Sequence, residues 1–239
     1  MMYGYGNMIS PSNRLFSGAS PLWGGLLAYY TADNTPNDAL GNYNGTLVNG
    51  ATYGTGIISQ GFSLDGVNDT VDFGNVLDFD GSTPFSISVW VKPSSLTSSA
   101  KIPLAKALNV TPFVGYWIFL STSATGFVLA NDNPNNLIAV KNSQILTNNV
   151  WYNLLVTYDG SKSASGTKLY VNGNLNTQTT LNDTLTGSTS NTASLKFGAR
   201  TDAFYFGGGV DEVAFFNEEK TALHAVELYN GGAGKQYPL

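Results

Sequence analysis

Short apolar runs of alternating pattern, separated by clusters of Gly, Asn, Asp and Ser, are the feature that most restricts how this chain folds. In the strongest run, Phe85 to Val91, every second residue is apolar and falls on one face of an extended strand. Comparable runs recur from Leu26 to Phe216 with no helical pattern between them. Consecutive strands without intervening helices predict a mostly antiparallel sheet. We therefore expect an all-β fold.

Two local signals refine this prediction. Asn172-Gly173 lies between two apolar runs and suits a tight type I′ hairpin, whose central residues both need a positive φ. One short helix is expected near the C-terminus, with Asn217 as its N-cap, Glu218 and Glu219 in its first turn, and an end before Gly231.

Composition excludes several classes of site. The chain has no cysteine, so disulfides, thiol nucleophiles and zinc ribbons are absent. Its one histidine, His224, shares a face of the expected helix with Lys220 and Glu227, and we expect it to point to water. A net charge of −5 without a basic cluster argues against nucleic acid as a partner.

The chain also carries no sign of membrane insertion. No stretch approaches the roughly 18 apolar residues of a membrane span. The first residues lack the charged start and apolar core of a secretory signal. We expect an extracellular or virion-surface location, reached by another export route, after processing or by lysis.

Residues 1–23 read as an N-terminal arm, because they are rich in Gly, Ser, Tyr and Asn and show no sustained period. Four aromatic residues in it are candidate anchors that order on a partner, since aromatics are enriched at interfaces. They are Tyr3, Tyr5, Phe16 and Trp23. The alternative is a frayed tail. Residues 24–239 show no break in composition, which predicts one domain.

Several segments of that domain resemble one family when taken together. They are Gly25 to Tyr30 followed by Asp33, Asn37 to Asn42, Asn44 to Leu47, Phe62 to Asp69, Phe85 to Lys92, Trp151 with Thr157 to Gly160, Leu169 to Gly173, and Val210 to Val213. In this order they resemble the laminin-G-like, concanavalin-A-like jelly-roll superfamily. The resemblance implies a two-sheet antiparallel jelly-roll sandwich. We expect its core to include Phe85, Val89, Trp90, Trp117, Trp151 and Tyr158, with Ser86 and Ser88 on the outward face.

The resemblance also implies a possible structural calcium site. Asp33, Asp38 and Asp211 match positions where this family often places one, and Asn34 and Asn44 could add neutral oxygens. Calcium takes six to eight oxygen ligands, so a loop rich in Asp and Asn is suitable material. The alternative is that Asp33 and Asp38 form turns by accepting hydrogen bonds from nearby backbone.

No catalytic set is evident. Retaining glycosidases of this fold hold two carboxyl groups on one face of a strand, as in Glu-x-Asp-x-Glu, and no such run exists. All four glutamates lie at or beyond position 212. A glycoside hydrolase using scattered aspartates stays an alternative.

We therefore expect a non-catalytic, lectin-like module for recognition or display that binds a glycan or a protein. The N-terminal arm could attach it to other subunits of a larger particle such as a virion. The aromatic residues in loop-like contexts that could stack on a sugar are Tyr43, Tyr53, Phe113 and Tyr205. A purely structural phage head or tail decoration protein is the alternative.

Overall fold

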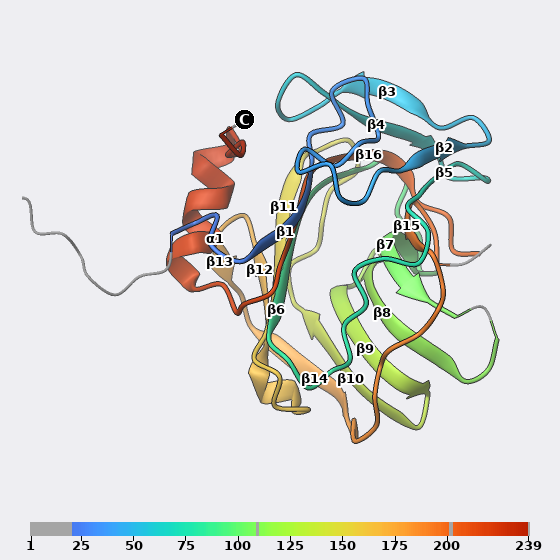
Figure 1. Cartoon of the computed structure of the whole chain (residues 1–239), viewed down its shortest axis with the longest axis vertical. Helices are drawn as coiled ribbons and strands as arrows, with labels where there is room; N and C mark the ends of the chain where they lie inside the picture. Colours follow the sequence, from blue (N-terminus) through green and yellow to red (C-terminus); the bar gives the residue numbers. More distant parts are fainter. Residues whose placement is uncertain (1–20, 109, 201–202, 239) are drawn as a thin grey trace, which may run out of the picture.

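Two antiparallel sheets of eight strands each face one another in the computed structural model, which describes residues 21–108, 110–200 and 203–238 (Figure 1). Sheet I contains β13 (Asn174–Leu175), β12 (Thr167–Val171), β11 (Tyr152–Tyr158), β6 (Phe85–Pro93), β16 (Gly207–Phe216), β4 (Gln60–Asp65) and β3 (Thr52–Thr55) in that order, and β1 (Leu26–Tyr30) pairs with β16. Sheet II contains β14 (Gln178–Asp183), β10 (Asn136–Asn142), β9 (Thr125–Asn133), β8 (Phe113–Leu120), β7 (Lys101–Ala107), β15 (Leu195–Phe197), β5 (Thr70–Asp72) and β2 (Thr46–Val48). The predicted jelly-roll sandwich is confirmed.

The main core lies between the sheets and follows the alternation of the strands. Phe85, Val89 and Tyr158 are fully buried in it, as predicted. Trp90 is buried on the opposite face of sheet I, because it stands between the inward residues Val89 and Val91 of β6. Its indole stacks on Tyr229 at 5.8 Å between centroids.

The two other predicted core tryptophans also lie outside the main core. Trp117 is 4 % exposed in a separate apolar cluster on the outer face of sheet II. Trp151 is half-buried just before β11, with the Lys92 ammonium 5.8 Å from its ring centroid. All three misplacements have one cause: alternation identifies two faces but not what covers the outer one.

The predicted hairpin is confirmed. Asn172 (φ 51°) and Gly173 (φ 76°) connect β12 to β13, and Tyr170 pairs with Leu175 across the turn. Both central residues have the positive φ that a type I′ turn requires.

The C-terminal helix is present but starts later than predicted. Helix α1 spans Ala222–Tyr229, and its N-cap is Thr221, not Asn217. The Thr221 hydroxyl accepts a hydrogen bond from the backbone N–H of His224, while His224 Nδ1 accepts one from the N–H of Thr221. His224 is therefore 3 % exposed, and our expectation that it points to water was wrong.

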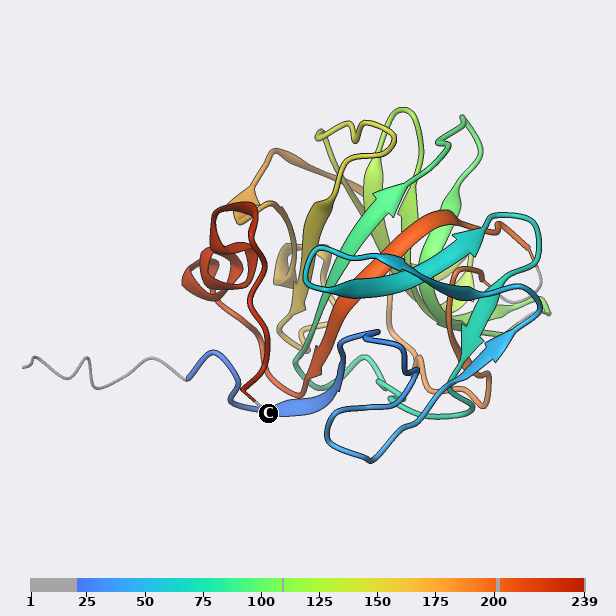
Figure 2. The same ribbon diagram turned by 90° about the horizontal axis from the view of Figure 1, so that it is seen from above.

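The segment before α1 covers the outer face of sheet I. Ser86 and Ser88 lie on this outward face, as predicted, and the covering segment buries both of them. Ser86 Oγ donates to the carbonyl of Glu218 and accepts from the N–H of Lys220, both at 2.8 Å. Glu218 and Glu219 precede the helix, so the prediction that they lie in its first turn was wrong, and Glu218 forms an ion pair with Lys220. Both views place α1 on the outer side of sheet I, away from β7 to β10 (Figure 1, Figure 2).

Helices in the described part of the chain are short. Besides α1 there are the 3₁₀ turns η1 (Ala164–Gly166) and η2 (Asn230–Gly232). In these same residues, none of the helices has the length and apolar character needed to cross a membrane.

Candidate functional site

Asp38, a predicted calcium ligand, organises the turn that follows β1. Its Oδ1 accepts hydrogen bonds from the N–H groups of Tyr29 (2.8 Å) and Leu40 (3.1 Å). Its Oδ2 accepts from those of Asn42 (3.0 Å) and Tyr43 (3.3 Å). The side chain is 4 % exposed. Four backbone donors thus engage both oxygens, which agrees with the turn interpretation.

The other two predicted ligands meet at a different place. Asp211 Oδ2 accepts from the N–H groups of Ile57 (2.8 Å) and Ile58 (3.3 Å), and Asp33 Oδ1 accepts from that of Gln60 (2.9 Å). Burial raises the pKa of Asp211 to about 7, and the negative charge of Asp33 adds to the rise. Both carboxyl groups therefore fasten the segment between β3 and β4 to the sheet.

The donor set does not form a three-carboxylate site. Within the described residues, no group of three or more His, Cys, Asp or Glu side chains is placed to hold a metal ion. Backbone donors account for the recorded contacts of Asp33, Asp38 and Asp211. Calcium binding stays a prediction.

Glu212 is a buried acid that the sequence did not single out. It lies at an irregularity of β16, between the ladder with β4 and the ladder with β1, and has a φ of 46°. Its side chain is 3 % exposed, and neither carboxylate oxygen has a hydrogen-bond partner within the described part of the chain. Burial raises the pKa of Glu212 to about 8. This group is therefore held protonated near neutral pH.

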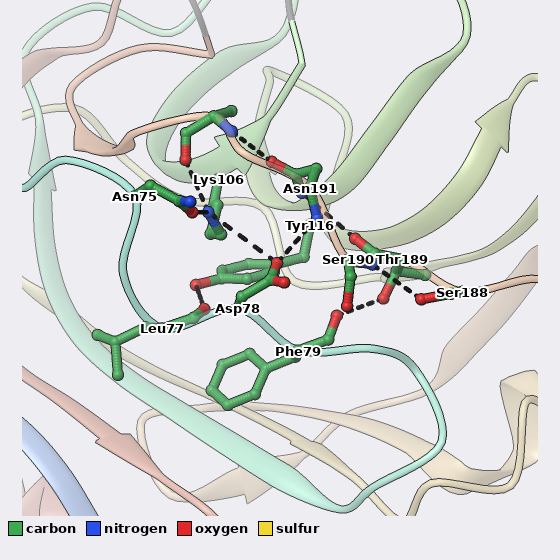
Figure 3. Close-up of polar contacts among 11 residues, drawn as sticks. Asn75, Leu77, Asp78, Phe79, Lys106, Tyr116, Ser188, Thr189, Ser190 and Asn191 are labelled. Atoms are coloured by element: carbon green, nitrogen blue, oxygen red, sulfur yellow. Dashed lines mark hydrogen bonds and ion pairs between the residues drawn. The ribbon is translucent and has the colours of Figure 1, made fainter.

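A buried lysine closes one end of the sandwich. Lys106 of β7 donates from Nζ to Asn75 Oδ1 and to the carbonyl of Ala193, both at 2.6 Å, and lies 4.0 Å from an oxygen of Asp78 (Figure 3). Burial lowers the pKa of Lys106, and the charge of Asp78 opposes that effect.

The surrounding loops complete this network. Tyr116 donates from its hydroxyl to the carbonyl of Leu77, and Asn191 donates its N–H to Asp78 (Figure 3). The ammonium is engaged on several sides and fully buried, so the network ties two loops to β7 and β8 and leaves no open place for a ligand.

An open pocket of about 270 Å³ lies on the outer face of sheet II. Trp117 and Val128 are buried at it, whereas Phe204 is 43 % exposed at its edge. The guanidinium carbon of Arg200 lies 4.7 Å from the ring centroid of Phe113 and 4.8 Å from those of Trp117 and Phe204. We call this pocket, together with the ring of Phe113 beside Arg200, the aromatic pocket. Burial lowers the pKa of Arg200, and within residues 21–108, 110–200 and 203–238 none of those that line the pocket is acidic.

Phe204 also has an unusual backbone. Its φ is 58°, which is an outlier for a bulky side chain and costs on the order of 1 to 3 kcal/mol. Phe204 therefore combines an exposed aromatic ring with a strained backbone. The sequence around Phe204 does not indicate this pocket, because the pocket joins β7, β8 and β9 to a segment far along the chain.

The four aromatic residues that we expected to be available for stacking on a sugar lie in different environments. Phe113 lies in the aromatic pocket against Arg200. Tyr205 is half-buried and forms a bridge with Ile102, which lines the pocket. Tyr43 and Tyr53 pack against the main core, and Tyr53 lies 5.7 Å from the ring centroid of Phe62.

Of the predicted anchors in the arm, the structure describes Trp23. Its ring lies 5.4 Å from that of Tyr29, 6.2 Å from that of Phe216 and 5.5 Å from that of Tyr237. Trp23 therefore packs on the domain itself. Tyr3, Tyr5 and Phe16 lie outside the described residues, so their role stays a prediction.

Two packed antiparallel sheets define this domain as a jelly-roll sandwich, with an open pocket on one outer face. The model of the concanavalin A-like lectin/glucanases superfamily matches residues 65–225, more than half of the chain. The chain belongs to this superfamily. No curated protein sequence is similar enough to count as a match.

Solved structures share the fold at low sequence identity. The binding domain of Paraclostridial Mosquitocidal Protein 1 is 17 % identical with a TM-score of 0.71, over 89 % of this chain and 53 % of that domain. The receptor binding domain of botulinum neurotoxin D is 17 % identical with a TM-score of 0.65, and the match covers 89 % of this chain and 54 % of that domain. This chain thus spans about half the length of either toxin domain. A third similar structure is Domain 4 of AbnA, an extracellular GH43 arabinanase from Geobacillus stearothermophilus, in complex with arabinotriose. It is 23 % identical with a TM-score of 0.59, and the match covers 84 % of this chain and 97 % of that domain.

Proposed function

We propose that this domain is a non-catalytic recognition module that binds a glycan in the aromatic pocket. The observation that carries the proposal is the exposed ring of Phe204, held in a costly backbone conformation beside Arg200. Sugar rings stack on aromatic faces, and a guanidinium donates hydrogen bonds to hydroxyl oxygens. The three similar structures are described as binding domains or as a complex with a trisaccharide, which fits this role.

The size of the pocket limits its occupant. At about 270 Å³ it is smaller than the roughly 300 to 1,000 Å³ of sites that enclose drug-sized ligands. We infer that it takes one terminal sugar unit, with the rest of the glycan or glycoprotein outside. A glycosidase needs two carboxyl groups facing each other across the scissile bond. None of the described residues that line this pocket is acidic, which argues against hydrolysis by this part of the chain.

A glycan array followed by titration calorimetry tests the proposal. We expect Phe204→Ala to weaken binding of the best array ligand about tenfold or more, since a stacking contact is lost. Leu181→Ala is the matched control, because Leu181 is 48 % exposed on β14 and does not line the pocket. An array without any ligand, or equal affinities for Phe204→Ala and the parent, would contradict the proposal.

We further propose that the N-terminal arm attaches the module to a larger assembly, at an extracellular or virion surface. Tyr3, Tyr5 and Phe16 are the anchors of this hypothesis. Deleting residues 2–20 retains Trp23 and its contacts with the domain. We expect loss of assembly with an unchanged melting temperature. Unchanged assembly makes residues 1–20 a tail without an attachment role.

A further inference from the structure

A second groove lies on the outer face of sheet I and crosses β3, β4, β16 and β6. Val210 and Val91 point into the main core, so their neighbours Gly209 and Lys92 face outward. Gly209 pairs with Ser63 on one side and with Lys92 on the other. The groove has a volume of about 240 Å³. It is distinct from the aromatic pocket, which lies on the other sheet.

Backbone atoms of Gly208 and Gly209 form part of the groove surface, and the ring of Trp151 lies where a side chain on Gly209 would stand. A Cβ atom on Gly209 would lie 2.5 Å from Cη2 of Trp151, so only glycine lets the indole lie directly on β16. Trp151 is half-buried, and its ring lies beside Lys92 and Gly209, which both line the groove. This arrangement provides an apolar platform next to a shallow polar surface.

The charge of the groove comes from one side chain. Lys92 is half-buried, and its ammonium lies 5.8 Å from the ring centroid of Trp151. Within residues 21–108, 110–200 and 203–238, no hydrogen bond or ion pair engages that ammonium. None of the lining residues is acidic, whereas the whole chain carries a net charge of −5. A cation without a counter-charge in an acidic protein favours an anionic ligand.

Several of the other lining residues carry neutral polar side chains. Ser63, Ser94 and Asn149 offer two hydroxyl groups and an amide around the glycine floor. Such groups exchange hydrogen bonds with the hydroxyl groups of a sugar. Lys92 is the one cation among the described lining residues, so the groove can pair with a single anionic group, such as one carboxylate.

We propose that this groove binds a carboxylate-bearing saccharide. The carboxylate pairs with Lys92, the apolar face of the sugar ring lies against the indole of Trp151, and the ring hydroxyl groups reach Ser63, Ser94 and Asn149. The module would then present an acidic-saccharide site on sheet I and the proposed glycan pocket on sheet II. The two sites are independent, so either can fail without the other.

Titration calorimetry on the full chain tests the charge requirement. The probes are trigalacturonic acid, trimannuronic acid and sialyllactose, together with the methyl ester of each, which keeps the ring and removes the charge. We expect at least one acid to bind and its ester to bind about tenfold to a hundredfold more weakly. Added salt should weaken binding of the acid and leave binding of the ester unchanged.

Variants locate the site. Lys92→Met keeps the length of the side chain and should weaken binding of the acid by the same tenfold to hundredfold. Lys92→Gln is a second variant if the first folds poorly. Lys141→Met is the control, because it makes the same change of charge on β10 of sheet II. Phe204→Ala should leave binding of the acid unchanged, because it alters the other pocket.

Several results would overturn the proposal. They are the absence of binding for all three acids, equal affinity for acid and ester, unchanged affinity in Lys92→Met, and loss of binding in Phe204→Ala instead. The last result would assign the acidic saccharide to the aromatic pocket, and so would leave the proposed function standing.

Discussion

Glu212 makes a prediction about how the stability of this domain depends on pH. Its carboxyl group is 3 % exposed, and its folded-state pKa is about 8, against an ordinary value of 4.5. The protonated form therefore persists in the folded state to a higher pH than in the unfolded state. Between these two values the folded state binds more protons, so the free energy of unfolding falls as pH rises.

The magnitude follows from the two pKa values. Each pH unit between them is worth about 1.4 kcal/mol for one group. Allowing for partial ionisation at both ends, Glu212 should remove roughly 3 to 4 kcal/mol of stability between about pH 5 and pH 8. Asp211, whose pKa is raised to about 7, acts in the same direction up to that pH. A domain is stable by about 5 to 15 kcal/mol in total, so the loss is large.

Urea unfolding followed by tryptophan fluorescence measures this loss at several values between about pH 5 and pH 8. Glu212→Gln keeps the shape of the protonated side chain and cannot ionise, so its stability should depend on pH less steeply than that of the parent. Glu227→Gln on the exposed side of α1 is the control and should keep the parent slope. A parent whose stability is flat over this range, or a Glu212→Gln slope equal to the parent's, would refute the reasoning.

Three further predictions follow from the buried polar groups and the calcium hypothesis. Lys106→Met leaves Asn75 Oδ1 and the Ala193 carbonyl without their donor and should lower the free energy of unfolding by about 2 to 4 kcal/mol in urea; no change would contradict the structural role of the network. Asp38→Ala removes an acceptor for four backbone N–H groups and should cost about 2 to 3 kcal/mol by the same measurement, with a loss below about 0.5 kcal/mol as the contrary result. If calcium binds the folded domain, chelator lowers the melting temperature and added calcium restores it. A melting temperature that chelator leaves unchanged, in the parent and in Asp211→Ala, would contradict the calcium hypothesis.

The strands and the hairpin could be predicted because their causes are local. Alternation in Phe85 to Val91 identifies a strand from seven adjacent residues, and Asn172-Gly173 satisfies the φ requirement of the turn within two. The start of α1 was misplaced for a different reason. Asn217 and Thr221 both suit an N-cap, and the choice depends on the bonds that Ser86, 131 residues or more away, makes with the intervening segment.

The two proposed binding surfaces could not be predicted because each joins residues that the fold alone brings together. Trp151 looked like a core residue from its sequence, yet its position depends on a glycine of β16 and a lysine of β6. Arg200 meets aromatic rings from β8 and from the segment after β15. A strand pattern specifies two faces, and the inner one is filled by the opposing sheet. The outer face is covered in one place, as at Ser86, and open in another, as at Phe204. In this fold the open places are therefore where aromatic and cationic side chains are free to serve recognition.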